Sequence, residues 1–216
     1  MTVNGTVTKS FYLLFLVALS SLSTWLYLAM SHNFHTVTVF SGMGSIASLI
    51  IGFIAIYKPQ TCHITAPLYS IFQGFALGSV TTLLSLRYGG IAFQGVALAM
   101  LLSYKFGLIK ATEKFRSMVT IATGGIFIVY MVSMLLGLFG IHLPFLHTGL
   151  FGIIFSLVVI GVAALNLILD FDNIEQGARN RAPAYMEWVG AFGLMLTLIW
   201  LYWEILRLIS ILRNDD

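Results

Sequence analysis

Acidic side chains are rare in this chain, and half of them stand close together. The sequence has 216 residues with eight Asp and Glu, and none of these precedes Glu113. Four fall between Asp170 and Glu187, in the stretch that begins LNLILDFDNIEQG. A charged side chain at membrane depth costs about 2.5–3.5 kcal/mol on insertion scales. Carboxylates at the end of a long apolar run are therefore candidates for binding protons or cations.

Asp170 and Asp172 cannot share one face of a helix. Residues at i and i+2 point about 200° apart around a helix axis. Asp170 lies on the same face as Asn166, one turn earlier, whereas Asp172 lies with larger apolar residues such as Leu165 and Ile168. We expect Asp170 to point into the protein and Asp172 to face lipid headgroups or a loop.

Two interpretations of Asp170 remain open. It is either an interfacial residue solvated near Arg179 or Arg181, or a carboxylate that shares a proton or a cation with another acid. The oxygen ligands that calcium prefers could come from Asp170, Asp172, Asn166 and Glu187. So few carboxylates would bind calcium weakly, which suits conduction better than storage.

Two further acids have both a structural and a functional interpretation. Glu187 opens the last apolar run, and a carboxylate is stabilised at a helix N-terminus by about 0.3–1 kcal/mol. Glu204 lies inside that run, three residues before Arg207. At this spacing the two charges can partly neutralise each other. We treat Glu204 and Arg207 as secondary candidates.

The composition places these residues in a membrane protein. The chain is 59% hydrophobic and only 9% charged, with a mean hydropathy of +0.96, whereas a soluble domain carries about 25% charged residues. The net charge of +3 comes from basic residues in short loops, where they set topology. We therefore expect contact with the lipid bilayer and not with nucleic acid.

Seven apolar runs predict seven transmembrane helices in a single α-helical bundle domain over residues 1–216. A span needs about 20 mostly apolar residues, and the candidates are 10–30, 36–57, 65–86, 91–109, 117–140, 149–169 and 187–209. The fourth is the weakest, because Lys105 interrupts it. Small residues, as in the GFALG stretch from Gly74 to Gly78, predict close helix contacts.

The basic residues predict the orientation of the bundle. With seven spans, one side collects Lys9, Lys58, Lys110, Lys114, Arg116, Arg179 and Arg181, whereas the other collects Arg87 and Arg213. Because the more basic side is cytoplasmic, we expect a multi-pass protein of the cell (inner) membrane with its N-terminus in the cytoplasm and its C-terminus outside.

Several segments resemble the transmembrane Bax inhibitor motif family, and particularly its bacterial Bax inhibitor-1-like/YccA branch. They are ITAPLY, GLIKATEKFR, IATGGI and the stretch from LNLILDFDNIE to the end of the last run. The resemblance implies six helices around a central seventh. It also implies a pH-sensitive calcium leak, sensed by one aspartate at the end of helix six and another in helix seven. Other members inhibit a membrane-anchored ATP-dependent protease or modulate cell death.

The residues of this chain match that sensor only in part. Asp170 matches the aspartate of helix six. The aspartate of helix seven falls on Thr197, ten residues before Arg207, and a threonine cannot ionise. Asp172 or Glu187 is then the candidate substitute.

We therefore expect a pH-sensitive calcium leak channel, with calcium or protons as the transported or bound ions and no other cofactor. The alternative is a non-conducting regulator that binds a membrane-anchored protease or another membrane partner. An enzyme is not expected, because the chain has no H-E-x-x-H motif and its aspartates lack the context of an intramembrane protease.

Overall fold

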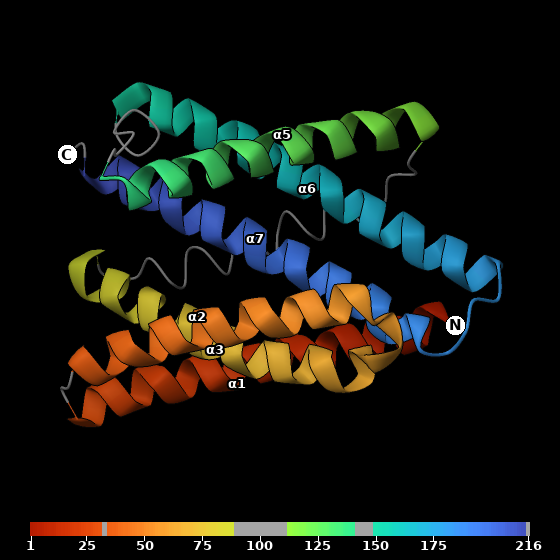
Figure 1. Cartoon of the computed structure of the whole chain (residues 1–216), viewed down its shortest axis with the longest axis horizontal. Helices are drawn as coiled ribbons and strands as arrows, with labels where there is room; N and C mark the ends of the chain where they lie inside the picture. Colours follow the sequence, from red (N-terminus) through yellow and green to blue (C-terminus); the bar gives the residue numbers. More distant parts are fainter. Residues whose placement is uncertain (32–33, 89–111, 141–148, 215–216) are drawn as a thin grey trace. The chain divides into compact units, whose positions relative to one another are not determined.

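The computed structural model describes residues 1–31, 34–88, 112–140 and 149–214, and this part of the chain is all-helical. The helices are α1 (Val3–Ser31), α2 (Phe34–Tyr57), the short 3-10 helix η1 (Pro59–Thr61), α3 (Cys62–Tyr88), α5 (Glu113–Leu138), α6 (Gly149–Arg179) and α7 (Met186–Asn214) (Figure 1). The predicted fourth span, 91–109, lies outside the described residues. The expected count of seven helices therefore stays a prediction.

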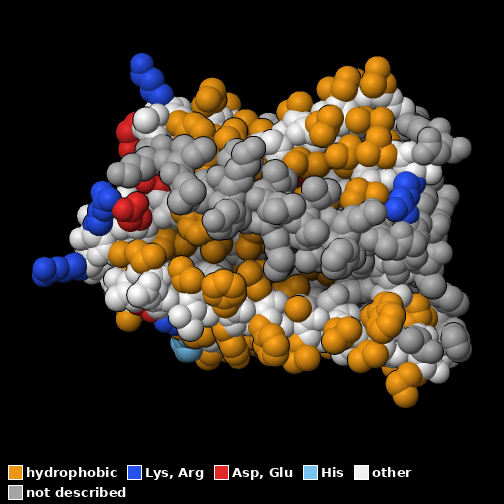
Figure 2. All heavy atoms as spheres, turned by 180° about the vertical axis from the view of Figure 1, so that it is seen from behind, with side chains coloured by type: hydrophobic (Ala, Val, Ile, Leu, Met, Phe, Trp, Pro, Cys, Tyr) orange, Lys and Arg blue, Asp and Glu red, His pale blue; other side chains and the backbone are white. Residues whose placement is uncertain are grey.

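Five of these helices are long and apolar enough to cross a bilayer, namely α1, α2, α5, α6 and α7. Figure 2 shows hydrophobic side chains spread widely over the visible face. Phe11, Phe53, Ile121 and Phe127 are each more than half exposed, which in a soluble protein would leave a large unfavourable apolar surface. The chain is a multi-pass membrane protein.

The helices form two compact units, which we describe separately. The first unit contains Met1–Gly89 and Asn173–Leu196, and the second contains Gly90–Asp172 and Thr197–Asp216. Each unit therefore includes part of α6 and part of α7. The expectation of one domain over 1–216, with α7 at its centre, stays a prediction.

Close packing between α1 and α3 organises the first unit. A Cβ atom built on Gly74 would lie 2.6 Å from the carbonyl oxygen of Val17, and one on Gly78 would lie 2.6 Å from that of Ser21. Real side chains do not approach a backbone so closely. The close contact predicted from the GFALG stretch is confirmed, because glycine lets two backbones meet.

The ends of α5 and α6 follow from local sequence. Thr112 caps α5, and its hydroxyl accepts a hydrogen bond from the Phe115 amide at 3.3 Å. At the end of α6, Arg181 has a left-handed φ of 51°. The Ala182 amide donates to the Gly177 carbonyl at 2.9 Å, as in a Schellman motif, and Pro183 follows. This turn stops α6 and redirects the chain into α7.

One helix boundary differs from the expectation. The sixth span was predicted to end at residue 169, so that Asp170 would lie at its terminus. Instead α6 continues to Arg179, and its last turns contain the good helix formers Glu175, Gln176 and Ala178. Asp170 is consequently an interior residue of a helix, with its backbone already hydrogen-bonded.

Candidate functional site

The Asp170 carboxylate lies between α6 and α7 in the second unit. Its neighbour on α7 is Thr197, whose side chain is hydrogen-bonded to it. The other carboxylate oxygen, Oδ2, is buried and has no hydrogen-bond partner among the described residues. A hydroxyl that donates to a carboxylate makes a charge-assisted hydrogen bond, which is stronger than a neutral one. The pair therefore links α6 to α7 and leaves one acceptor free for a proton or a cation.

Asp172 has a different partner. Its Oδ2 accepts a hydrogen bond from Arg116 Nη2 of α5 at 2.6 Å, and the two side chains are mostly buried. The expectation that Asp172 faces lipid headgroups or a loop is therefore wrong. The long arginine side chain reaches Asp172 from the start of α5 and neutralises it, a contact that helix periodicity alone does not reveal.

Asn166 joins α6 to α5 one turn below Asp170. Its side-chain amide donates to the Thr123 hydroxyl at 2.6 Å and to the Val162 carbonyl at 2.9 Å. The side-chain hydroxyl of Thr123 donates in turn to the Val119 carbonyl. Asn166 thus serves as an interhelical contact with its amide protons satisfied.

Glu187 lies in the first unit and is bound there by residues of α1. Lys9 Nζ forms an ion pair with it, and the Thr2 backbone amide donates to Oε1 at 2.8 Å. The Lys9 ammonium also lies 5.4 Å from the centre of the Trp188 ring. These contacts tie the start of α7 to α1, and the role of Glu187 as a substitute for the second aspartate stays a prediction.

Glu204 and Arg207 form the expected ion pair, with Oε2 and Nη1 3.6 Å apart. A third residue joins them from α5: the Tyr130 hydroxyl donates to Glu204 Oε1 at 2.6 Å and accepts a hydrogen bond from Arg207. Glu204 is only 5% exposed. The three residues form a polar cluster inside the second unit, in which Glu204 and Arg207 carry the charges.

No group of three or more His, Cys, Asp or Glu side chains within the described ranges could hold a metal ion together. A calcium site at Asp170 and Asp172 stays a prediction, although the two carboxylates have separate partners.

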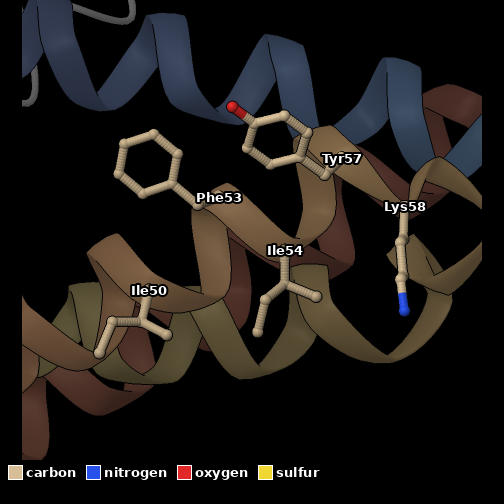
Figure 3. A pocket seen from close by; sticks show the side chains of 5 residues that line it. All are labelled: Ile50, Phe53, Ile54, Tyr57 and Lys58. Atoms are coloured by element: carbon tan, nitrogen blue, oxygen red, sulfur yellow. The ribbon is translucent and has the colours of Figure 1, made fainter.

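A pocket of about 460 Å³ on α2 is lined by Ile50, Phe53, Ile54, Tyr57 and Lys58 (Figure 3). Its walls are mainly apolar, as on a lipid-facing surface.

The sequence model of the Bax inhibitor 1 like family matches residues 1–214. The chain belongs to the Bax inhibitor 1 like family. No curated protein matches the chain significantly, and no solved structure does so.

Within this Bax inhibitor 1 like protein, sequence reasoning missed three partner residues on α5. They are Arg116, Thr123 and Tyr130, which contact Asp172, Asn166 and Glu204 respectively. The three follow one another at intervals of seven residues, so they lie on one face of the helix. This spacing is the signal in the sequence that could have identified them.

Proposed function

We propose that this protein is a pH-sensitive calcium leak channel of the cell inner membrane, closed at the contact between Asp170 and Thr197. The supporting observation is the carboxylate of Asp170 in a membrane helix, whose Oδ2 is buried and has no hydrogen-bond partner among the described residues. Buried carboxylates inside spans are expensive and usually functional. The resemblance to calcium-leak members, in which Asp170 corresponds to the helix-six sensor, supports the same function.

Protonation of Asp170 would weaken the closure. Hydrogen bonds to charged groups contribute about 1.5–3 kcal/mol, against about 0.5–1.5 kcal/mol for neutral ones. When Asp170 takes up a proton, the bond from Thr197 becomes a neutral one. Since about 1.4 kcal/mol corresponds to tenfold in an equilibrium, a difference of about 1 kcal/mol would shift the equilibrium between closed and open states roughly fivefold towards the open state. Calcium flux would then rise as the pH falls.

Liposomes that contain the purified protein and a calcium indicator test this function. Wild-type protein should carry more calcium at pH 6 than at pH 8. Asp170→Asn removes the charge and should give a high flux that is the same at both pH values. Glu175→Gln is the matched control, because Glu175 is an exposed acid of α6 paired with Arg179, and it should behave like the wild type.

Two results would contradict the proposal. One is the absence of calcium flux through the folded wild-type protein at every pH. The other is a pH dependence of Asp170→Asn that equals that of the wild type. Either result would leave Asp170 as a structural residue.

A non-conducting regulator is the second candidate, supported by open small-residue positions on α5. Cβ atoms built on Gly124 and Gly125 meet no atom of the described chain within 4 Å. Such positions allow close approach of another helix, for example the anchor of a membrane-bound ATP-dependent protease. Photo-crosslinkers placed next to these glycines in native membranes should capture that partner, and exclusive self-crosslinking would count against this candidate.

A further inference from the structure

The cluster of Tyr130, Glu204 and Arg207 contains a carboxylate that is not fully satisfied. Tyr130 donates to Oε1 at 2.6 Å, and the Trp200 side chain also hydrogen-bonds Glu204. Oε2 is buried and has no hydrogen-bond partner in the described chain, and the nearest cationic atom is Arg207 Nη1 at 3.6 Å. This oxygen faces a positive charge at a distance too long for a hydrogen bond.

Arg207 is held in place by aromatic groups as well as by Glu204. Its guanidinium carbon lies 5.4 Å from the centre of the Tyr130 ring and 5.5 Å from that of Phe155. Cation–π contacts of this kind operate within about 6 Å. The tyrosine and phenylalanine rings lie edge to face, 6.1 Å apart. Three helices, α5, α6 and α7, thus surround one guanidinium.

The cluster is in register with Asp170 along the same helices. On α7, Glu204 follows Thr197 by seven residues, and on α5, Tyr130 follows Thr123 by seven. Seven residues return to nearly the same face about 10.5 Å further along a helix. On α6, residues spaced by three or four positions lie on one face of the helix. Counted back from Asp170, this face carries Asn166, Ala163, Val159 and Ser156.

An apolar layer separates the two polar positions. Val159 and Ala163 of α6 and Leu201 of α7 are all fully buried, at 0% exposure. Beyond this layer Ser156 is also fully buried, and its hydroxyl lacks a hydrogen-bond partner in the described chain. The second unit therefore has polar groups at two depths, with an apolar, buried section between them, as a closed pathway would have.

We propose that Tyr130 and Glu204 form a second cation-binding position in series with Asp170, and that the Arg207 guanidinium occupies it as a tethered cation. The proposal rests on the proposed leak function. A permeating divalent cation would need the oxygens that Glu204 and Tyr130 present. Since Arg207 cannot be deprotonated in proteins, it competes with a permeating cation for this position and limits the flux at every pH, whereas Asp170 sets the pH dependence of the flux.

Removal of the tethered cation tests this arrangement. In the liposome assay, Arg207→Ala should raise calcium flux several-fold at pH 6, where protonation of Asp170 has weakened the first closure. Ethylguanidinium added to the solution should then block Arg207→Ala and leave the wild type unaffected, because only the variant has an empty position. Tyr130→Phe, a milder change, should give a smaller rise, since it removes the hydroxyl that holds Arg207. Arg207→Ala combined with Glu204→Gln should lose the block by ethylguanidinium.

Arg179→Gln is the control, because Arg179 forms a comparable but exposed pair with Glu175 on α6, and its flux should equal that of the wild type. If the wild type conducts with the expected pH dependence but Arg207→Ala and Tyr130→Phe do not change flux, the second position is refuted and the channel function survives. A rise in Arg207→Ala that ethylguanidinium does not block would also refute it, as general loosening. If neither the wild type nor any variant conducts, both proposals fail.

Discussion

At the scale of single residues, the main finding is that a hydroxyl stands where the resemblance places a second carboxylate. Asp170 is hydrogen-bonded to Thr197 on α7, and its second oxygen is buried without a partner among the described residues. A pair of carboxylates would share a proton between them. In the proposed channel Asp170 would supply the proton response of this pair alone, because threonine does not ionise.

Thr197→Val should destabilise the protein, because it keeps the shape of the side chain and removes the donor to Asp170. Loss of a hydrogen bond to a buried charged group costs roughly 1.5–3 kcal/mol. We expect a lower midpoint of thermal unfolding in detergent and a higher calcium flux at pH 8. Thr197→Ser keeps the hydroxyl and should match the wild type in both measurements. Equal flux through the valine and serine variants would show that this hydroxyl does not hold the closure.

The acidic residues Asp172 and Glu187 differ from Asp170 in the side chains that they contact. Each is paired with a basic side chain, Arg116 for Asp172 and Lys9 for Glu187. Such pairs compensate much of the cost of removing a charge from water. Asp170 has no basic partner of this kind in the described chain, and this difference singles it out.

At the scale of helices, two kinds of interface can be distinguished. In the first unit, small residues bring α1 and α3 into backbone contact at Gly74 and Gly78. In the second unit, α5, α6 and α7 meet through polar side chains spaced by about seven residues. The first kind depends on the absence of a side chain, whereas the second depends on matched hydrogen-bonding groups.

Gly78→Val should therefore destabilise the first unit. Its Cβ would lie 2.6 Å from the Ser21 carbonyl oxygen and 2.8 Å from the Ser21 Cα, so the backbones must move apart. Overpacking of this kind costs about 1–3 kcal/mol, and the thermal midpoint in detergent should fall. The control is Gly42→Val on α2, where a Cβ meets nothing within 4 Å. A similar loss at both positions would point to helix propensity and not to the contact with α1.

At the scale of the whole molecule, the orientation in the membrane follows from the number of spans. An odd number places the two termini on opposite sides, and the basic residues favour the N-terminal side as cytoplasmic. The predicted fourth span decides whether the number is odd, and residues 91–109 lie outside the part of the chain that the structure describes. The expected orientation can be measured directly.

Single cysteines report this orientation. Cys62 is the one natural cysteine and is buried. Cys62→Ala removes this thiol and gives a cysteine-free protein into which single cysteines can be introduced for labelling. In that background, Asn214→Cys should react with a membrane-impermeant maleimide on intact cells or spheroplasts. Asn4→Cys should react only after lysis. Labelling of both positions from the same side would mean an even number of spans and would contradict the predicted fourth span.

The sequence by itself determined the membrane class, most of the helices and the candidate Asp170. These features are local: apolar runs reflect the thickness of the bilayer, and helix periodicity shows that Asp170 and Asp172 face different ways. The close approach of a neighbouring helix at the GFALG stretch could also be predicted, because only small residues permit it. The i, i+3 pair of Glu204 and Arg207 required nothing beyond one helix.

The tertiary structure alone decided which side chains meet across helices. Thr197 lies against Asp170, Arg116 pairs with Asp172, and Tyr130 bridges Glu204 and Arg207. Periodicity predicts the face on which a residue lies, but not the helix that packs there or its axial register. Those depend on how the side chains of neighbouring helices interdigitate along their whole length, which no short stretch of sequence contains.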